Sequence, residues 1–135
     1  EMKYSKVNIG DEIPGRDYTP DIVQSMLYNA SLWNGHRIHF DYEYATREEG
    51  YEGLILPGPL IGDWLHQCIE EWLGDAGRIH SISYSNRLAS TVGETLTSGG
   101  VITSVDDSGN RAEIEVFVKN SKGEIVAPGK AVVKF

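Results

Sequence analysis

The chain has 135 residues, 40% hydrophobic and 24% charged, a balance that suits one globular domain with a buried core and excludes disordered and fibrous classes. Twenty acidic and twelve basic side chains give a formal net charge of -8, which argues against nucleic acid and anionic membranes as partners. The single cysteine, Cys68, offers no internal disulfide, and no signal peptide or membrane span is visible, so we expect a cytoplasmic protein.

The first part of the chain predicts a short strand followed by a helix. Residues 6–19 are typical of a strand with turns, and Thr19 and Pro20 are expected as the N-cap and the first helical residue. Apolar residues then recur at helical spacing, and the helix is expected to stop near Asn34-Gly35, where glycine permits a chain reversal. These apolar positions are Ile22, Val23, Met26, Leu27 and Ala30.

A long buried helix is predicted over residues 59–73, after a short polar helix over residues 41–49. Its apolar residues lie on one side, and acidic and amide side chains lie largely on the other. Gly74 is expected to end it. The apolar side consists of Ile61, Trp64, Leu65, Cys68, Ile69, Trp72 and Leu73.

Beyond this helix the hydrophobic pattern changes to period two, which predicts antiparallel strands joined by polar turns. The turns fall at residues 106–109 and 121–123. The expected strands cover residues 79–88, 94–105, 110–120 and 124–135. The pattern therefore predicts an α+β protein with an antiparallel sheet, and the order of elements indicates that the sheet wraps around the long helix.

The segment between the two helices carries the chemistry. His36 and His39 follow the Asn34-Gly35 turn, and an apolar run containing Gly58 opens the long helix. Imidazole titrates near neutral pH, and the first N–H groups of a helix stabilise negative charge. The segment thus predicts a base and an oxyanion-stabilising donor that face each other.

The order of residues in this segment resembles that of the MaoC-like hydratases and dehydratases of the hot-dog superfamily. Ile38-His39 and Asp41 match the R-specific enoyl-CoA hydratases, whereas Asn34 stands where those enzymes have their catalytic aspartate. The 3-hydroxyacyl-thioester dehydratase and mesaconyl-CoA hydratase-like branch is more similar, with N-x-H-R-I-H-Y-D, then E-G-Y, then a V-x-G-P-L-like element. The corresponding segments here are residues 34–41, 49–51 and 56–60.

The resemblance implies a single hot-dog domain over residues 1–135 that forms a homodimer or higher oligomer, because pairing removes an exposed sheet edge and closes the substrate tunnel. It implies an enzyme of fatty acid metabolism, without a cofactor, that reversibly hydrates a 2-enoyl thioester or dehydrates the (R)-3-hydroxyacyl form. The substrate is expected to be an acyl-CoA or an acyl-carrier thioester. The sequence leaves both the carrier and the acyl chain open.

Catalytic roles are expected for three residues. By the resemblance, His39 transfers the proton. Asn34 cannot take a proton, but its amide can orient the water, and Gly58 at the start of the long helix can donate a hydrogen bond to the oxyanion. No metal site is expected, because Asp63 and His66, three residues apart on the helix, lack a third ligand.

Four further residues are expected to bind substrate: His36, Arg37, Leu60 and Arg87. Each basic residue among them has a structural alternative. His36 can support His39, Arg37 can form an ordinary salt bridge rather than bind a phosphate, and Arg87 can support a subunit interface.

Two other functions stay open. Because Asn34 replaces the aspartate, the chain also fits a partner subunit of a heteromeric hot-dog hydratase, whose pocket a different chain completes. A hot-dog thioesterase would share the fold and the thioester site, although the arrangement of Ile38, His39 and Asp41 argues against it.

Overall fold

Two α-helices and five strands make up most of residues 7–135, the part of the chain that the computed structural model describes. The helices are α1 (Ile22–Ser31) and α2 (Gly58–Leu73), and short helical turns form η2 (Arg37–His39), η3 (Tyr44–Glu48) and η4 (Gly74–Ala76). The strands are β1 (Glu12–Tyr18), β2 (Arg78–Tyr84), β3 (Leu96–Val105), β4 (Arg111–Lys119) and β5 (Ile125–Lys134). The predicted α+β class is confirmed.

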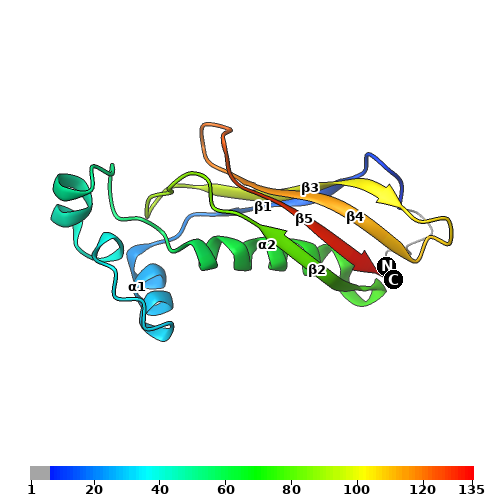
Figure 1. The fold of residues 1–135 in the computed structure, drawn as a ribbon, viewed down its shortest axis with the longest axis horizontal. Helices are drawn as coiled ribbons and strands as arrows, with labels where there is room; N and C mark the ends of the chain where they lie inside the picture. Colours follow the sequence, from blue (N-terminus) through cyan, green and yellow to red (C-terminus); the bar gives the residue numbers. More distant parts are fainter. Residues whose placement is uncertain (1–6) are drawn as a thin grey trace.

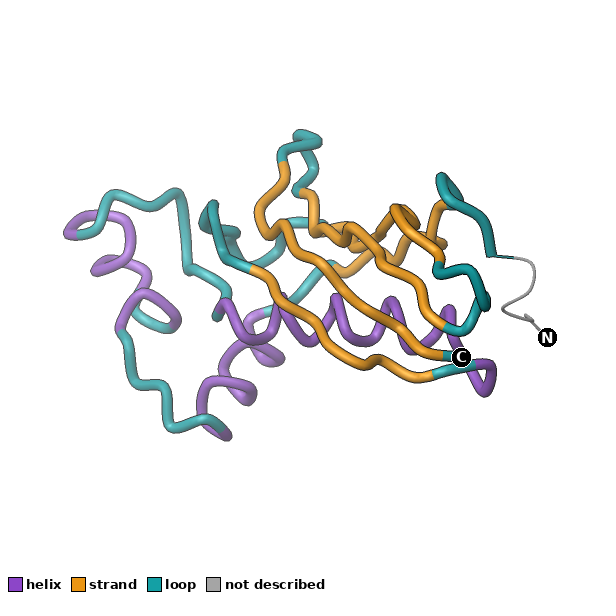
Figure 2. The backbone as a smooth tube through the Cα atoms, turned by 45° about the vertical axis from the view of Figure 1, so that its right-hand side comes forward, coloured by secondary structure: helices purple, strands orange, loops and turns teal. Residues whose placement is uncertain are grey.

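The strands form one antiparallel sheet in the order β1-β3-β4-β5-β2, with α2 packed along one face (Figures 1 and 2). The predicted turns join β3 to β4 and β4 to β5. In β4 every second side chain is buried, as a sheet with one covered face requires. These buried residues are Ala112, Ile114, Val116 and Val118. The expected antiparallel sheet around one long helix is therefore confirmed.

The position of α2 is set by its buried face and by two glycines. Trp64 stacks on Tyr18 of β1, with ring centroids 4.8 Å apart. Gly62 lies so close to β2 that a Cβ atom would overlap the Tyr84 ring, so only glycine permits this approach. The helix ends at Gly74, which has a φ of 51° and donates its N–H to the Glu70 carbonyl, as predicted.

The start of α1 differs from the prediction. Its N-cap is Asp21 rather than Thr19, because the Asp21 carboxylate accepts the Gln24 N–H at 2.8 Å. Pro20 lies outside the helix, where its carbonyl accepts the Gly93 N–H at 2.8 Å. The helix also ends earlier than expected, at Ser31.

The strand β2 is shorter than predicted, and the residues after it shape the site. It ends at Tyr84, and the chain then keeps only irregular hydrogen bonds to β5, such as the 2.8 Å bond from the Arg87 N–H to the Val126 carbonyl. Further along, the Ser90 carbonyl accepts the Leu56 N–H at 2.8 Å. This bond places the segment 85–92 beside the residues that lead into α2.

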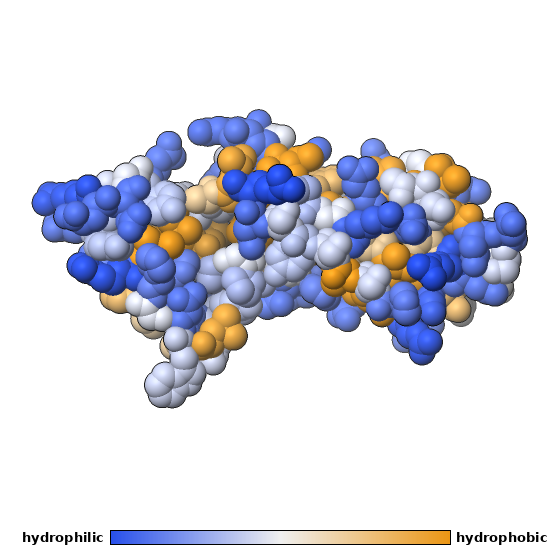
Figure 3. Space-filling model, viewed as in Figure 1, coloured by the Kyte–Doolittle hydropathy of each residue, from blue (hydrophilic) through white to orange (hydrophobic). Residues whose placement is uncertain are grey.

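One end of the molecule is formed by α1 and the turns that follow it, beyond the end of the sheet in Figure 1. The outward face of α1 carries large apolar side chains, and Figure 3 shows hydrophobic residues among hydrophilic ones at this end. On this face of α1 the exposed fractions are 53% for Ile22, 54% for Val23, 53% for Met26 and 59% for Leu27. A helix that exposes its apolar face lacks a covering partner in the single chain. No helix in residues 7–135 is long and apolar enough to cross a membrane.

Candidate active site

The loop from Asn34 to His39 is folded by its own side chains. The Asn34 Oδ1 atom accepts the His36 N–H at 3.2 Å, and His36 Nδ1 accepts the Ile38 N–H at 3.3 Å. Both are local turns of the kind that these side chains favour. The single turn η2 follows and directs His39 inward, where the residue is only 8% exposed.

His39 is held in one tautomer. Its Nδ1 atom lies 2.6 Å from the carbonyl oxygen of Ile55. A carbonyl oxygen can only accept, so Nδ1 carries the hydrogen, and in the neutral ring Nε2 keeps its lone pair. The Ile55 N–H also donates to the Ile38 carbonyl at 3.0 Å, which fixes the two segments together. The imidazole is therefore a base with a fixed orientation.

Gly58 is the first residue of α2 and offers a free donor. Within residues 7–135 its N–H has no hydrogen-bond partner, and Pro57, the N-cap, provides no capping side chain. The helix dipole adds partial positive charge at this end. A Cβ at position 58 would meet the Asn86 side chain, so glycine leaves room for this close approach. This end of α2 is suited to hold a developing negative charge.

His39 and Gly58 line the same pocket, which has a volume of about 320 Å³. Arg87 lines it too and donates its Nε–H to Ser85 Oγ at 2.8 Å. The loop before α2 and the segment after β2 supply the walls. The lining residues are Ile38, His39, Ile55, Leu56, Gly58, Ile61, Asn86, Arg87, Leu88, Ala89 and Ser90.

The other expected site residues lie outside this set of lining residues. His36 is exposed, and its ring meets the His39 ring edge-on with centroids 6.0 Å apart. Arg37 pairs with Asp41 at 2.8 Å and covers the Tyr44 ring at 4.2 Å. The hydrogen bond from Arg37 keeps the pKa of Asp41 below its usual value. Leu60 is buried and borders a separate pocket beside α1. The Asn34 side chain accepts the His36 N–H within the turn described above.

Ser90 is a residue of the pocket that sequence reasoning missed. It is 1% exposed, and its hydroxyl has no partner within residues 7–135. A single serine in an irregular segment carries no local signal. Its position depends on the long-range contact between residues 90 and 56.

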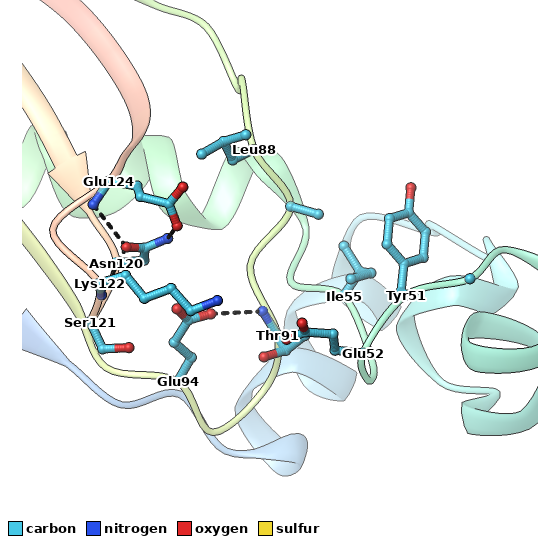
Figure 4. A pocket seen from close by; sticks show the side chains of 12 residues that line it. Tyr51, Glu52, Ile55, Leu88, Thr91, Glu94, Asn120, Ser121, Lys122 and Glu124 are labelled. Carbon is cyan, nitrogen blue, oxygen red and sulfur yellow. Dashed lines mark hydrogen bonds between the residues drawn. The ribbon is translucent and has the colours of Figure 1, made fainter.

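A second pocket of about 430 Å³ adjoins the first and shares Ile55, Leu88 and Ala89 with it. Figure 4 shows Tyr51 on one side of it and the turn between β4 and β5 on the other. Three carboxylates, those of Glu52, Glu94 and Glu124, line it together with one ammonium group, that of Lys122. This charge balance disfavours a phosphate ligand, and the pocket has no imidazole, so the candidate active site is the one with His39.

Comparison with known proteins identifies the family of this chain. Residues 4–92 match the family model described as hydroxyacyl-thioester dehydratase type 2. The chain is 43% identical over 44 residues to the mitochondrial enzyme of that name from Schizosaccharomyces pombe, and the match covers 33% of this chain and 15% of the relative. It is 46% identical over 46 residues to mesaconyl-C(4)-CoA hydratase of Chloroflexus aurantiacus, and this match covers 34% of this chain and 16% of the relative. The matches thus span less than a fifth of either relative.

Solved structures share the fold over nearly the whole chain. The (R)-hydratase from A. caviae involved in PHA biosynthesis superposes with a TM-score of 0.86 at 19% identity, covering 96% of this chain and 98% of that one. The ChsH1-ChsH2 complex from Mycobacterium tuberculosis gives 0.81 at 16% identity, covering 95% and 98%. The expected hot-dog fold is confirmed. Since the family model matches well over half of its residues, the chain belongs to the hydroxyacyl-thioester dehydratase type 2 family.

Proposed function

We propose that this chain is a hydro-lyase that reversibly adds water to a trans-2-enoyl thioester and, in reverse, dehydrates the (R)-3-hydroxyacyl thioester. One observation carries the proposal: a base of fixed tautomer, His39, and a free helix N-terminal donor, Gly58, line one pocket. The family membership and the names of the two curated relatives, a dehydratase and a hydratase, support the same chemistry.

The proposed mechanism needs one proton-transfer group and one oxyanion donor. The water oxygen bonds to the β-carbon while Nε2 of His39 takes a water proton. The electron pair of the double bond moves onto the thioester oxygen, where the Gly58 N–H stabilises the enolate. The enolate then collapses as the α-carbon takes the proton back from the imidazolium, so the net change is addition of one water. The (R) configuration comes from the family resemblance alone.

The remaining expectations are part of the same proposal. Asn34 orients the water, His36 supports the His39 ring, and Arg37, Arg87 and Leu60 contribute to substrate binding. The edge-on contact between the two imidazoles and the place of Arg87 in the pocket wall support two of these roles. A catalytic domain over residues 1–135 and a cytoplasmic location also stay predictions, and the S. pombe relative is named as mitochondrial.

We propose further that a second hot-dog chain completes the active unit. β2 lies at one edge of the sheet, and α1 exposes its apolar face, so both can be covered by a partner. A homodimer is the simpler assembly. A heteromer is the alternative. It is favoured by the asparagine at position 34 and by the ChsH1-ChsH2 complex, which contains two different chains and shares the fold.

Assay of the purified chain with crotonyl-CoA, followed by loss of the enoyl absorbance, tests the proposal. Hydration to 3-hydroxybutyryl-CoA is expected, with retention of the thioester bond. Release of free thiol, detected with a disulfide dye, would instead identify a thioesterase. Activity that appears only after addition of a second hot-dog chain would identify a subunit of a heteromer.

A further inference from the structure

Ser90 is a buried serine whose hydroxyl is left unpaired by the protein. The residue is 1% exposed, and within residues 7–135 its Oγ atom has no hydrogen-bond partner. Buried polar atoms in native proteins are nearly always paired, and an exception calls for a physical reason, such as a ligand or a water molecule that joins the site. Ser90 is also one of the residues that line the pocket of His39.

Ser90 and His39 are bonded to the two sides of one peptide group, the one that joins Ile55 to Leu56. The Leu56 N–H donates to the Ser90 carbonyl at 2.8 Å, and His39 donates from Nδ1 to the Ile55 carbonyl at 2.6 Å. The C=O and the N–H of a trans peptide group point in opposite directions. Ser90 and His39 therefore approach this peptide group from opposite sides, and both line the pocket with Gly58.

Burial alone does not bring a hydroxyl to this site. Two other buried residues, Ser25 and Asn29 of α1, also have side-chain atoms without a partner within residues 7–135. Neither lines the pocket of His39. Ser90 combines an unpaired hydroxyl with a place in the pocket wall, and Ser25 provides a matched reference for a hydroxyl that is merely buried.

The environment of Ser90 fits a hydrogen-bonding role and not a nucleophilic one. A nucleophilic serine needs a base bonded to its hydroxyl. The Oγ atom of Ser90 makes no such bond to His39, whose Nδ1 is occupied by the Ile55 carbonyl. A neutral hydroxyl still offers one donor and two acceptor positions, enough to hold a water molecule or an alcohol.

We propose that Ser90 contacts the reacting water and holds it beside Nε2 of His39. The role rests on the proposed hydratase function. In hydration the water donates one hydrogen to Nε2 and its other hydrogen to Ser90 Oγ, which leaves an oxygen lone pair free for the β-carbon. In dehydration the same hydroxyl binds the 3-hydroxyl group of the substrate as it leaves.

The test compares Ser90→Ala with Ser25→Ala in the full chain. With crotonyl-CoA, Ser90→Ala is expected to lower kcat about ten- to hundredfold and to leave KM nearly unchanged, because the lost bond orients water rather than the thioester. Calorimetric titration with butyryl-CoA, which lacks the double bond, is expected to give the wild-type Kd. Ser25→Ala is expected to keep the wild-type kcat. Both variants should keep or raise Tm, since each removes an unpaired buried hydroxyl.

Each outcome is decisive. An active wild type with a Ser90→Ala variant that matches Ser25→Ala overturns the role of Ser90 and leaves the hydratase function intact. A loss confined to KM or to butyryl-CoA affinity overturns the water contact as well, because it assigns Ser90 to the thioester. A wild-type chain that hydrates no enoyl-CoA, alone or with a second chain, overturns the proposed function and this role with it.

Discussion

The Nδ1–H of His39 is bonded to the carbonyl oxygen of Ile55 at 2.6 Å, which leaves Nε2 as the basic atom of the ring. If Nε2 moves the proton, His39→Ala is expected to lower kcat by about two to four decades while the fold persists. His36→Ala, which removes the edge-on neighbour and the acceptor of the Ile38 N–H, should cost less. Steady-state kinetics with crotonyl-CoA and thermal melts of both variants provide the measurement. Equal, small losses in kcat would contradict the assignment.

Much of the fold was predictable because it rests on local periodicity. The buried side of α2 and the alternation in β4 appear directly in the sequence, and glycine at position 74 correctly predicts the end of the helix. The N-cap of α1 was predicted wrongly, because the carbonyl of Pro20 is bonded to Gly93, a partner far along the chain. Likewise β2 ends at Tyr84, because residues 85–88 keep only irregular hydrogen bonds to β5 before Ser90 bonds to Leu56, and no local pattern indicates these contacts.

The site was predictable on one wall only. His39 and Gly58 belong to a continuous motif, and both line the pocket. The opposite wall, with Asn86 and Ser90, depends on hydrogen bonds between distant segments. Arg87 was expected at the site, but only through the family resemblance. Residues brought together by tertiary contacts leave no spacing in the sequence that could be recognised.

Gly62 should be intolerant of any side chain, because a Cβ there would overlap the ring of Tyr84. Gly62→Ala forces α2 away from β2, and overpacking of this kind costs about 1–3 kcal/mol of stability. Urea denaturation measures the change. Gly35→Ala is the control, since a Cβ at that glycine meets nothing within 4 Å. Equal stabilities of the two variants would contradict the close contact between α2 and β2.

Cys68 should be an unreactive thiol in the folded protein. Burial raises its pKa above the ordinary value, because the thiolate would lose its hydration. Iodoacetamide at pH 8 is expected to label the folded chain slowly and the urea-unfolded chain fully, as read by intact mass. The raised pKa also contributes to stability. This contribution is fully present below the ordinary pKa of a free thiol, about 8.5, and it declines as the pH rises above that value. The Tm of wild type should therefore fall more steeply toward pH 10 than that of Cys68→Ala.

The exposed apolar face of α1 predicts an assembly that a single charge can weaken. Leu27 is 59% exposed in the single chain. If a partner covers it, Leu27→Glu places a carboxylate in an apolar interface and should shift the sedimenting species from dimer toward monomer. Gln24→Glu adds the same charge to a polar position of the same helix and should leave the assembly intact. Sedimentation velocity at micromolar concentration distinguishes these outcomes, and a wild type that sediments as an active monomer would refute the need for a second chain.

Asn34 has two roles, one in the turn and one proposed in catalysis, and its variants can distinguish them. Its Oδ1 accepts the His36 N–H at 3.2 Å, and the proposed function also gives it the orientation of water. Asn34→Asp keeps an acceptor of nearly equal size, so its Tm should match wild type, and its pH profile should change because a carboxylate now shares the proton transfer. Asn34→Ala removes both roles. It should lower kcat with little change in KM, since the contact with water acts mainly in the transition state, and it should lose about 0.5–1.5 kcal/mol of stability with the turn. A variant that loses stability but keeps kcat would leave Asn34 as a turn residue alone, and the water would then be held by the residues that line the pocket.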